Sequence, residues 1–286
     1  MPEEAEPIST RPLRSSRTMP EEDWTLAATS RALRERWESG HATFGAWATI
    51  GDSYLIELLA RTGFDWIGID MQHGLVTGPQ LTPMLQACAI TQTPVLVRVP
   101  GHTPEQTLQA LDAGANGVIV PLIDTAEEAA AAVAACRHPP AGTRSWGATR
   151  APLGAESYTA ADANEAVLCA VMVETAKAVE DVAAIVSVPG VDAIFVGPRD
   201  LRLSLGEPGQ AQLDEAILTV RDACADAGVV AGIYAGSAAA ALRWASEGFQ
   251  LVTVISDGNL VRQSARETLA EVRQRPERAD GQDVGY

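Results

Sequence analysis

Ionisable side chains lie at or just after the ends of several apolar segments of this sequence. Together these residues could carry out one kind of chemistry. The residues are Asp70 and His73 at and after WIGID, Arg98 in VLVRV, Glu174 at the end of VLCAVMVE, and Asp200 just past AIFVG. Glu174 and Asp200 are hard oxygen ligands that suit Mg²⁺ or Mn²⁺, and two carboxylates leave roughly four octahedral positions for water and substrate. A 2-oxo acid could fill two of these positions with its carboxylate and keto oxygens.

The other three residues could bind such an acid and transfer a proton to or from it. Arg98 can meet its oxygens with a planar guanidinium, so that metal and arginine together would stabilise the enolate formed when a bond beside the keto group breaks. His73 could move the proton, directly or through a metal-bound water, with Asp70 fixing the tautomer of its ring. Any one of the five could instead cap a helix or pair with a charge. Five together favour a site, because ionisable groups are costly to desolvate unless they are paired or bind a metal.

Two other kinds of catalysis fit the sequence less well. The one lysine, Lys177, falls past the end of an apolar run, which disfavours a Schiff-base aldolase. Neither a GxGxxG nor a GxxxxGK[ST] phosphate-binding loop is present. We therefore expect a divalent metal and no organic cofactor.

The elements that would position these residues alternate regularly along the chain. A leading helix is expected over 23–40, followed by eight apolar runs, at 43–49, 66–70, 95–99, 117–120, 167–174, 193–197, 229–235 and 251–256. The amphipathic stretches between and after them are 53–63, 78–90, 103–114, 125–136, 178–188, 213–228, 237–248 and 259–275. Continuous apolar runs are typical of parallel strands buried on both faces. The pattern predicts an α/β fold, a (β/α)8 TIM barrel with a leading N-terminal helix, in preference to an open doubly wound sheet. In such barrels the chemistry lies at the carboxyl ends of the strands.

The domain boundaries follow from this pattern. We expect a disordered N-terminal tail at 1–24, the barrel lyase domain at 25–275 and a flexible C-terminal tail at 276–286. The long connection 137–166 is rich in Pro and Gly and contains Arg144, Trp146 and Arg150. We interpret it as a loop over the barrel mouth whose side chains contact the acceptor substrate, from this subunit or a neighbour; an oligomer contact or a surface excursion is the alternative.

Composition excludes several classes of partner. Lys+Arg 21 against Asp+Glu 37 gives a net charge of −16, which argues against binding a nucleic-acid backbone. No apolar run approaches the roughly 18 to 20 residues that span a membrane, and no signal-peptide pattern opens the chain. The four cysteines lie in or beside apolar segments with no CxxC spacing, as buried free thiols would. We expect a cytoplasmic protein.

Longer segments carry a family resemblance. They are GAWATIGDSYLIELLARTGFDWIGIDMQHG, PVLVRVPGHTPEQTLQALDAGANGVIVP, HPPAGTRSWG, VMVETAKAVEDVAAIVSVPGVDAIFVGPRDL, GIYAG and VISDGNL. From about residue 30 to about residue 275 the chain resembles the HpcH/HpaI family of class II, metal-dependent pyruvate aldolases, and the order of DxxH, VRV, VET and GPxDL is its specific part.

The resemblance implies site residues, a metal and partners. It implies a barrel with Mg²⁺, Mn²⁺ or Co²⁺ held by Glu174 and Asp200, pyruvate bound by Arg98, and a catalytic His73 supported by Asp70. The backbone at Gly197–Pro198 matches the family segment that contacts the pyruvate carboxylate. The partners implied are a small 2-oxo acid, such as pyruvate or oxaloacetate, an aldehyde, and further copies of the chain, often in hexamers that exchange a C-terminal helix.

The sequence also departs from the family pattern. The frequent DxEH reads DMQH, which places Gln72 beside the histidine, and GPADLS reads GPRDLR, which adds Arg199 and Arg202. Gln72 and Arg199 are candidate substrate-binding residues. Arg199 could bind an extra carboxylate or phosphate on the aldehyde, or turn outward into an interface.

The leading hypothesis is reversible cleavage or formation of a 4-hydroxy-2-oxo acid through a pyruvate-type enolate. An oxaloacetate decarboxylase, or a carbon–carbon bond-forming enzyme like macrophomate synthase, would use the same residues. A citrate-lyase-like acyl-CoA lyase is disfavoured because no basic patch for a CoA phosphate is evident. The third alternative is a non-catalytic barrel that binds metal and an oxo acid.

Overall fold

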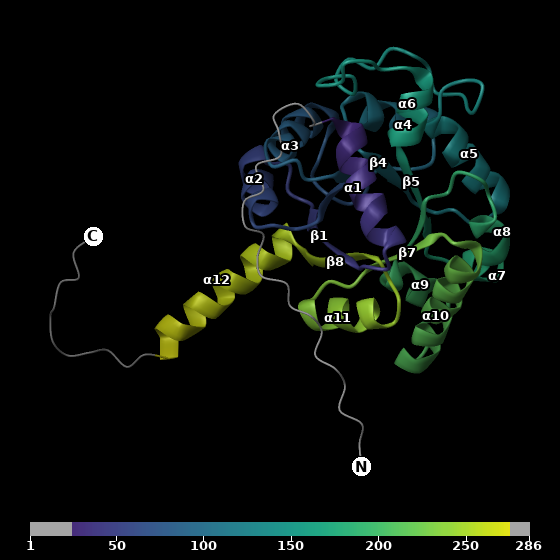
Figure 1. The fold of residues 1–286 in the computed structure, drawn as a ribbon. Helices are drawn as coiled ribbons and strands as arrows, with labels where there is room; N and C mark the ends of the chain where they lie inside the picture. Colours follow the sequence, from purple (N-terminus) through teal and green to yellow (C-terminus); the bar gives the residue numbers. More distant parts are fainter. Residues whose placement is uncertain (1–24, 275–286) are drawn as a thin grey trace, which may run out of the picture.

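The computed structural model describes residues 25–274, so the predictions for 1–24 and 276–286 lie outside the described residues. Eight parallel strands pair in sequence order and close into a barrel, with β8 beside β1. Helices surround the barrel, as Figure 1 shows. The predicted (β/α)8 barrel with a leading helix is confirmed, and the open doubly wound sheet is excluded.

The strands differ from their predicted bounds by at most one residue at either end. They are β1 Thr43–Ala48, β2 Trp66–Asp70, β3 Val95–Arg98, β4 Gly117–Val120, β5 Leu168–Val173, β6 Ala193–Val196, β7 Val230–Tyr234 and β8 Leu251–Ser256. Nearly every strand residue is buried. The apolar runs are continuous because one face of each strand lines the barrel interior and the other packs against helices.

The helices mostly follow the predicted stretches. They are α1 Leu26–Glu38, α2 Ser53–Arg61, α3 Gly78–Ile90, α4 Pro104–Asp112, α5 Ala126–Cys136, α6 Ala160–Ala166, α7 Ala176–Glu180, α8 Val182–Val186, α9 Pro198–Ser204, α10 Gln210–Ala227, α11 Ala238–Ser246 and α12 Asp257–Gln274. The single helix predicted over 178–188 is wrong, since α7 and α8 meet at Asp181. Two short helices were not predicted: α6, which starts at a Thr159–Asp162 capping box, and α9, which starts with Pro198.

Large aromatic side chains fill the barrel interior. Trp47, Trp66 and Phe195 belong to one buried cluster, and Trp47 stacks on Phe195 with ring centroids 5.6 Å apart. The strands make room for the rings with glycine, because a Cβ on Gly68 would lie 2.3 Å from the Trp47 ring. Leu33 of α1 belongs to the same cluster, so the leading helix closes the end of the barrel where the strands begin.

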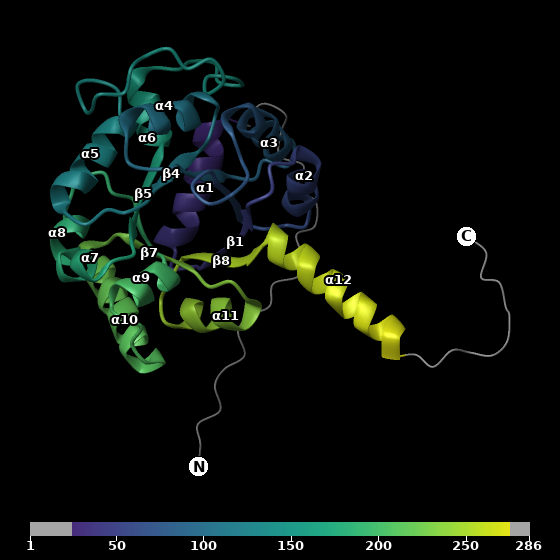
Figure 2. The same ribbon diagram turned by 180° about the vertical axis from the view of Figure 1, so that it is seen from behind.

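The connection between α5 and α6 lies at that same end of the barrel, beside α4 and α6 (Figures 1 and 2). Arg144 binds Asp112, the last residue of α4, at 2.9 Å, and Arg150 donates to the carbonyls of Ala113 and Leu85. The predicted loop over the barrel mouth is therefore wrong. In a (β/α)8 barrel a helix-to-strand connection lies where the next strand starts, so its arginines and Trp146 are remote from this chain's strand carboxyl ends.

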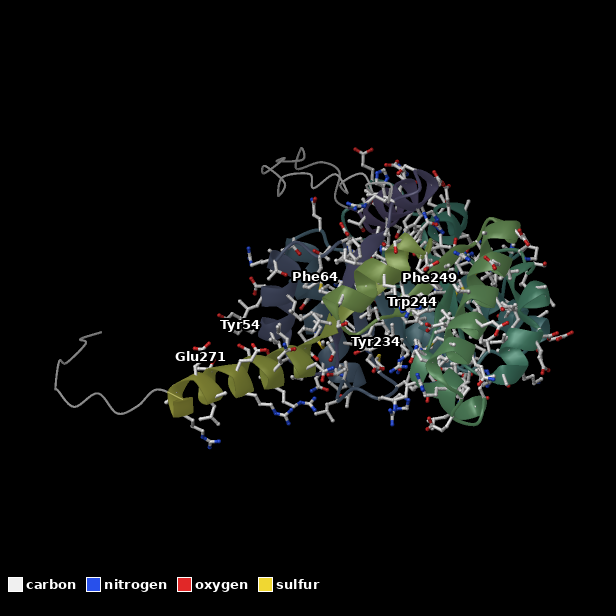
Figure 3. All side chains as sticks on the ribbon, turned by 90° about the horizontal axis from the view of Figure 1, so that it is seen from below. Tyr54, Phe64, Tyr234, Trp244, Phe249 and Glu271 are labelled. Carbon is white, nitrogen blue, oxygen red and sulfur yellow. The ribbon has the colours of Figure 1, made fainter. Side chains whose placement is uncertain are left out.

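The last helix stands away from the barrel. After Asp257 and Gly258, every residue of α12 whose side chain is described is exposed. Figures 1 and 2 show α12 projecting beyond the other helices, and in Figure 3 its side chains, with Glu271 near the end, stand clear of the barrel. Among residues 25–274, no helix is long and apolar enough to cross a membrane. The four cysteines are free and buried, as predicted.

Candidate active site

An arginine and an aspartate pair at the carboxyl ends of two neighbouring strands. Asp70 and Arg98 are the last residues of β2 and β3 and lie directly opposite each other in the strand register. Arg98 donates from Nε to Asp70 Oδ1 at 2.9 Å and from Nη2 to Asp70 Oδ2 at 2.6 Å. Its guanidinium also lies over the Trp47 ring, 5.3 Å from the centroid. Both charged side chains are nearly buried, which this bidentate pairing makes tolerable.

Asp70 organises the turn that carries the histidine. Its Oδ1 accepts hydrogen bonds from the backbone amides of Gln72 and His73, at 3.0 and 3.2 Å. Burial acts to raise the pKa of Asp70, but the hydrogen bonds and charge of Arg98, with the amide of His73 and the indole of Trp47, outweigh it and lower the pKa. The prediction that Asp70 fixes the tautomer of His73 is not supported, because the carboxylate holds the His73 backbone and is otherwise engaged by Arg98. The His73 ring is exposed and borders the cavity described below.

Glu174 follows β5 and is almost fully buried. Its Oε1 accepts a hydrogen bond of 2.8 Å from the amide of Leu122, a residue held in the left-handed region with φ 57°. Its Oε2 faces Gly197, where an added Cβ would lie 2.9 Å from that oxygen. A side chain at 197 would therefore require the Glu174 carboxylate to shift.

Glu174 and Asp200, the two predicted metal ligands, lie close enough for the charge of one to affect the pKa of the other. Burial raises the pKa of the Glu174 carboxyl; the amide of Leu122 opposes this rise and the nearby charge of Asp200 adds to it. Among the hydrogen bonds of residues 25–274, none reaches Glu174 Oε2. Two adjacent carboxylates, one buried with a free oxygen, are stabilised when a cation lies between them, so the residues present fit a divalent metal. Within the described chain no group of three or more His, Cys, Asp or Glu could hold a metal, so water, substrate or other oxygen atoms would complete the coordination.

These residues surround a cavity of about 200 Å³ at the carboxyl ends of the strands, which we term the strand-end cavity. Its lining is Trp47, Thr49, Asp70, His73, Arg98, Met172, Phe195, Gly197, Pro198, Arg199, Asp200 and Tyr234. Glu174 lies just behind Gly197. Gln72 is not part of the lining, and its side-chain Oε1 is buried without a hydrogen-bond partner in the described structure. Arg202 also faces elsewhere: it donates to Pro208 O and Gln210 Oε1.

Sequence reasoning missed one polar support of the cavity. Asp257, the first residue of α12, is 1% exposed and accepts from the amide and hydroxyl of Thr49 at 2.9 and 2.6 Å and from the amide of Ile50 at 2.9 Å. Thr49 is thereby fixed at the rim. Asp257 follows the apolar run LVTVIS, so it carries the same strand-end signal as the predicted residues. Trp47, Phe195 and Tyr234 also line the cavity, and no strand-end signal marks them because they belong to the apolar runs themselves.

A larger cavity of about 290 Å³ lies under α1 at the opposite end of the barrel. Its charged residues are Arg36 and Asp65, which bind each other at 2.9 Å. Because this pair neutralises itself and has no neighbouring nucleophile or histidine in the lining, the strand-end cavity is the better candidate for chemistry.

Comparison with known proteins gives a consistent result. The model of the family described as HpcH/HpaI aldolase/citrate lyase matches residues 43–264. Over 240 residues the chain is 40% identical to the hydroxypyruvate/pyruvate aldolase of Chromohalobacter salexigens, covering 82% of this chain and 94% of the relative. It is 34% identical over 244 residues to the 4-hydroxy-2-oxo-heptane-1,7-dioate aldolase of Salmonella dublin, covering 82% and 91%.

Solved structures agree with these relatives. A family protein of the HpcH/HpaI aldolase/citrate lyase type from Burkholderia cenocepacia superposes with a TM-score of 0.80 at 36% identity. The superposition covers 85% of this chain and 99% of that protein. The likeness therefore spans the whole barrel together with its strand-end cavity.

Proposed function

The chain belongs to the HpcH/HpaI aldolase/citrate lyase family, and from this premise we propose that it is a divalent-metal-dependent aldolase. It reversibly cleaves or forms a 4-hydroxy-2-oxo acid through a pyruvate-type enolate. The donor is pyruvate or hydroxypyruvate, as the name of the relative from Chromohalobacter salexigens suggests, and the acceptor is an aldehyde. The observation that carries the proposal is the convergence of Asp70, Arg98, His73 and Asp200 on one cavity, with Glu174 directly behind it.

Glu174 and Asp200 would hold the metal, which we propose is Mg²⁺, Mn²⁺ or Co²⁺. Once bound, a divalent cation supplies a Lewis acid that stabilises the negative charge of an enolate oxygen. Gly197 serves this arrangement by leaving Oε2 of Glu174 unobstructed, and the amide of Leu122 fixes the other carboxylate oxygen. The backbone at Gly197–Pro198 lines the cavity where the acid's carboxylate would lie.

Arg98 orients the 2-oxo acid. Its Nε and Nη2 are engaged by Asp70, while Nη1 makes no hydrogen bond within the described residues. The guanidinium therefore presents this remaining nitrogen to an anionic oxygen in the cavity. Because Asp70 and the Trp47 ring hold the guanidinium rigidly, little ordering is needed when substrate binds.

His73 moves the proton. Its ring makes no hydrogen bond to another described side chain and borders the cavity, so it can reach the hydroxyl of a bound 4-hydroxy-2-oxo acid. As that proton leaves, the carbon–carbon bond beside the carbinol breaks, the aldehyde forms and the electron pair passes to the enolate. Asp70 contributes by fixing the backbone of the histidine turn.

A cleavage assay tests the proposal. Chelator-treated protein is supplied with 4-hydroxy-2-oxopentanoate, and pyruvate release is measured with and without added Mg²⁺, Mn²⁺ or Co²⁺, for wild type and Glu174→Gln. We expect release that needs the cation and falls roughly 100-fold or more in the variant. Cation binding without pyruvate release from any 4-hydroxy-2-oxo acid would favour the non-catalytic barrel instead.

A further inference from the structure

One cation at the strand-end cavity forms no ion pair with the residues that the structure describes. Arg199, the second residue of α9, is exposed and lines the cavity. Within residues 25–274 it forms no ion pair, whereas eight other arginines bind a carboxylate. The cavity therefore holds two arginines in different states: Arg98 is paired with Asp70, and Arg199 forms no ion pair within the part of the chain that the structure describes.

Arg199 lies next to a proposed metal ligand, so its charge bears on what the cavity binds. It directly precedes Asp200, a proposed metal ligand, and a cation there works against binding a divalent metal unless an anion joins it. Arg202, one turn further along, donates instead to the loop between α9 and α10. Packing and loop structure thus explain Arg202 but not Arg199.

The rest of the cavity lining includes three aromatic side chains. Trp47 stacks on Phe195, and Tyr234 meets Trp47 edge-on with centroids 5.9 Å apart. An occupant would therefore meet a polar end at Arg98, an aromatic wall, and a second positive charge at Arg199.

We infer that Arg199 selects acceptor aldehydes that carry an oxyanion, a carboxylate or a phosphate, at the end remote from the carbonyl. This inference rests on the proposed aldolase function and names the substrate class of its second reactant. The guanidinium binds such an oxyanion through charge-assisted hydrogen bonds, which also offsets the repulsion of anionic substrates by a chain of net charge −16.

The test compares aldehydes that differ only in the anion. With pyruvate saturating and the metal present, kcat/KM is measured for succinic semialdehyde against butanal, and for glyceraldehyde 3-phosphate against glyceraldehyde. The first pair tests a carboxylate and the second a phosphate. The proteins are wild type, Arg199→Gln, Arg199→Lys and the control Arg31→Gln, which removes an exposed arginine without an ion pair at the other end of the barrel.

Wild type should prefer the anionic member of at least one pair by about 10-fold or more, in line with a hydrogen bond to a charged group. Arg199→Gln should bring that ratio near one, Arg199→Lys should retain part of it, and Arg31→Gln should match wild type. Added salt should also lower the ratio, because the contact is exposed.

Three results would overturn the inference: a wild-type ratio near one in both pairs, an Arg199→Gln ratio equal to that of wild type, or an equal loss in Arg199→Gln for the neutral and the anionic aldehyde. Each of these still includes turnover and leaves the aldolase proposal standing. Failure of that proposal is distinct, since wild type would then turn over neither neutral nor anionic aldehydes.

Discussion

Asp70 and Arg98 lie opposite each other on the neighbouring strands β2 and β3 and are joined by two hydrogen bonds, at 2.9 and 2.6 Å. Asp70 is only 2% exposed and Arg98 only 9%. The pair ties two strands together at the point where the proposed substrate would bind. It gives Arg98 a fixed orientation and leaves one of its nitrogens for the substrate. In the proposed mechanism, folding and catalysis therefore depend on the same contact, and variants can separate the two contributions.

Asp70→Ala should destabilise the fold by about 3–5 kcal/mol, because it leaves Arg98 buried without a counter-charge. Urea unfolding of wild type and variant measures this loss. The double variant Asp70→Leu/Arg98→Met, which removes both charges, should recover much of the stability while remaining without activity. An equal free energy of unfolding for wild type and Asp70→Ala would show that the pair does not contribute to stability as its burial implies.

The same pair predicts a pH dependence of stability. Since the folded-state pKa of Asp70 lies below its ordinary value of 3.8, its contribution is present above that value and is lost as the pH falls through the folded-state pKa. The difference in unfolding free energy between wild type and Asp70→Asn should thus be constant near neutrality and shrink below about pH 4. A difference that grew on acidification would contradict the lowered pKa.

How much of this could be predicted from sequence depends on whether the cause was local. The strands were predictable because each is a continuous apolar run, and Asp70, Arg98, Glu174 and Asp200 were found because a polar residue ends or follows such a run. The binding partner of Asp70 was not predictable, since cross-strand register places Arg98 opposite it and no local pattern records that register.

The connection 137–166 was assigned to the wrong end of the barrel for a different reason. Its length and its arginines suggested a role at the active site. However, it connects a helix to the next strand, and such connections lie at the end of the barrel where the strands begin. Gln72 was a candidate because of its neighbours in sequence, but it is not among the residues that line the cavity, and its Oε1 is buried without a partner in the described structure.

Gly197→Ala should weaken metal binding by roughly 10- to 100-fold, because its Cβ would crowd Glu174 Oε2 and shift a ligand. Isothermal titration with Mn²⁺ measures the Kd. Gly209→Ala is a matched control, since a Cβ there meets no atom within 4 Å. An unchanged Kd in Gly197→Ala would remove Glu174 from the proposed metal site.

The exposed helix α12 predicts self-association. Val261, Leu269 and Val272 lie on one side of the helix, at spacings of eight and three residues, and are 51%, 47% and 65% exposed. An apolar stripe on a helix that packs so little against its own barrel is stabilised when another copy covers it. We expect an oligomer by light scattering, with a hexamer as the size the family resemblance implies. Leu269→Asp should lower the measured mass and Glu271→Gln should not; a wild-type monomer at all concentrations would refute this expectation.

The central claim is that metal and Arg98 together stabilise a pyruvate enolate, and deuterium exchange tests it without any knowledge of the aldehyde. Pyruvate is incubated in D₂O with chelator-treated protein, with and without Mg²⁺, Mn²⁺ or Co²⁺, and its mass is followed over time. We predict incorporation into the methyl group that requires the cation and slows roughly 100-fold or more in Arg98→Ala and Glu174→Gln. Exchange that is equally fast without the cation, or no exchange although the cation binds, would contradict the claim.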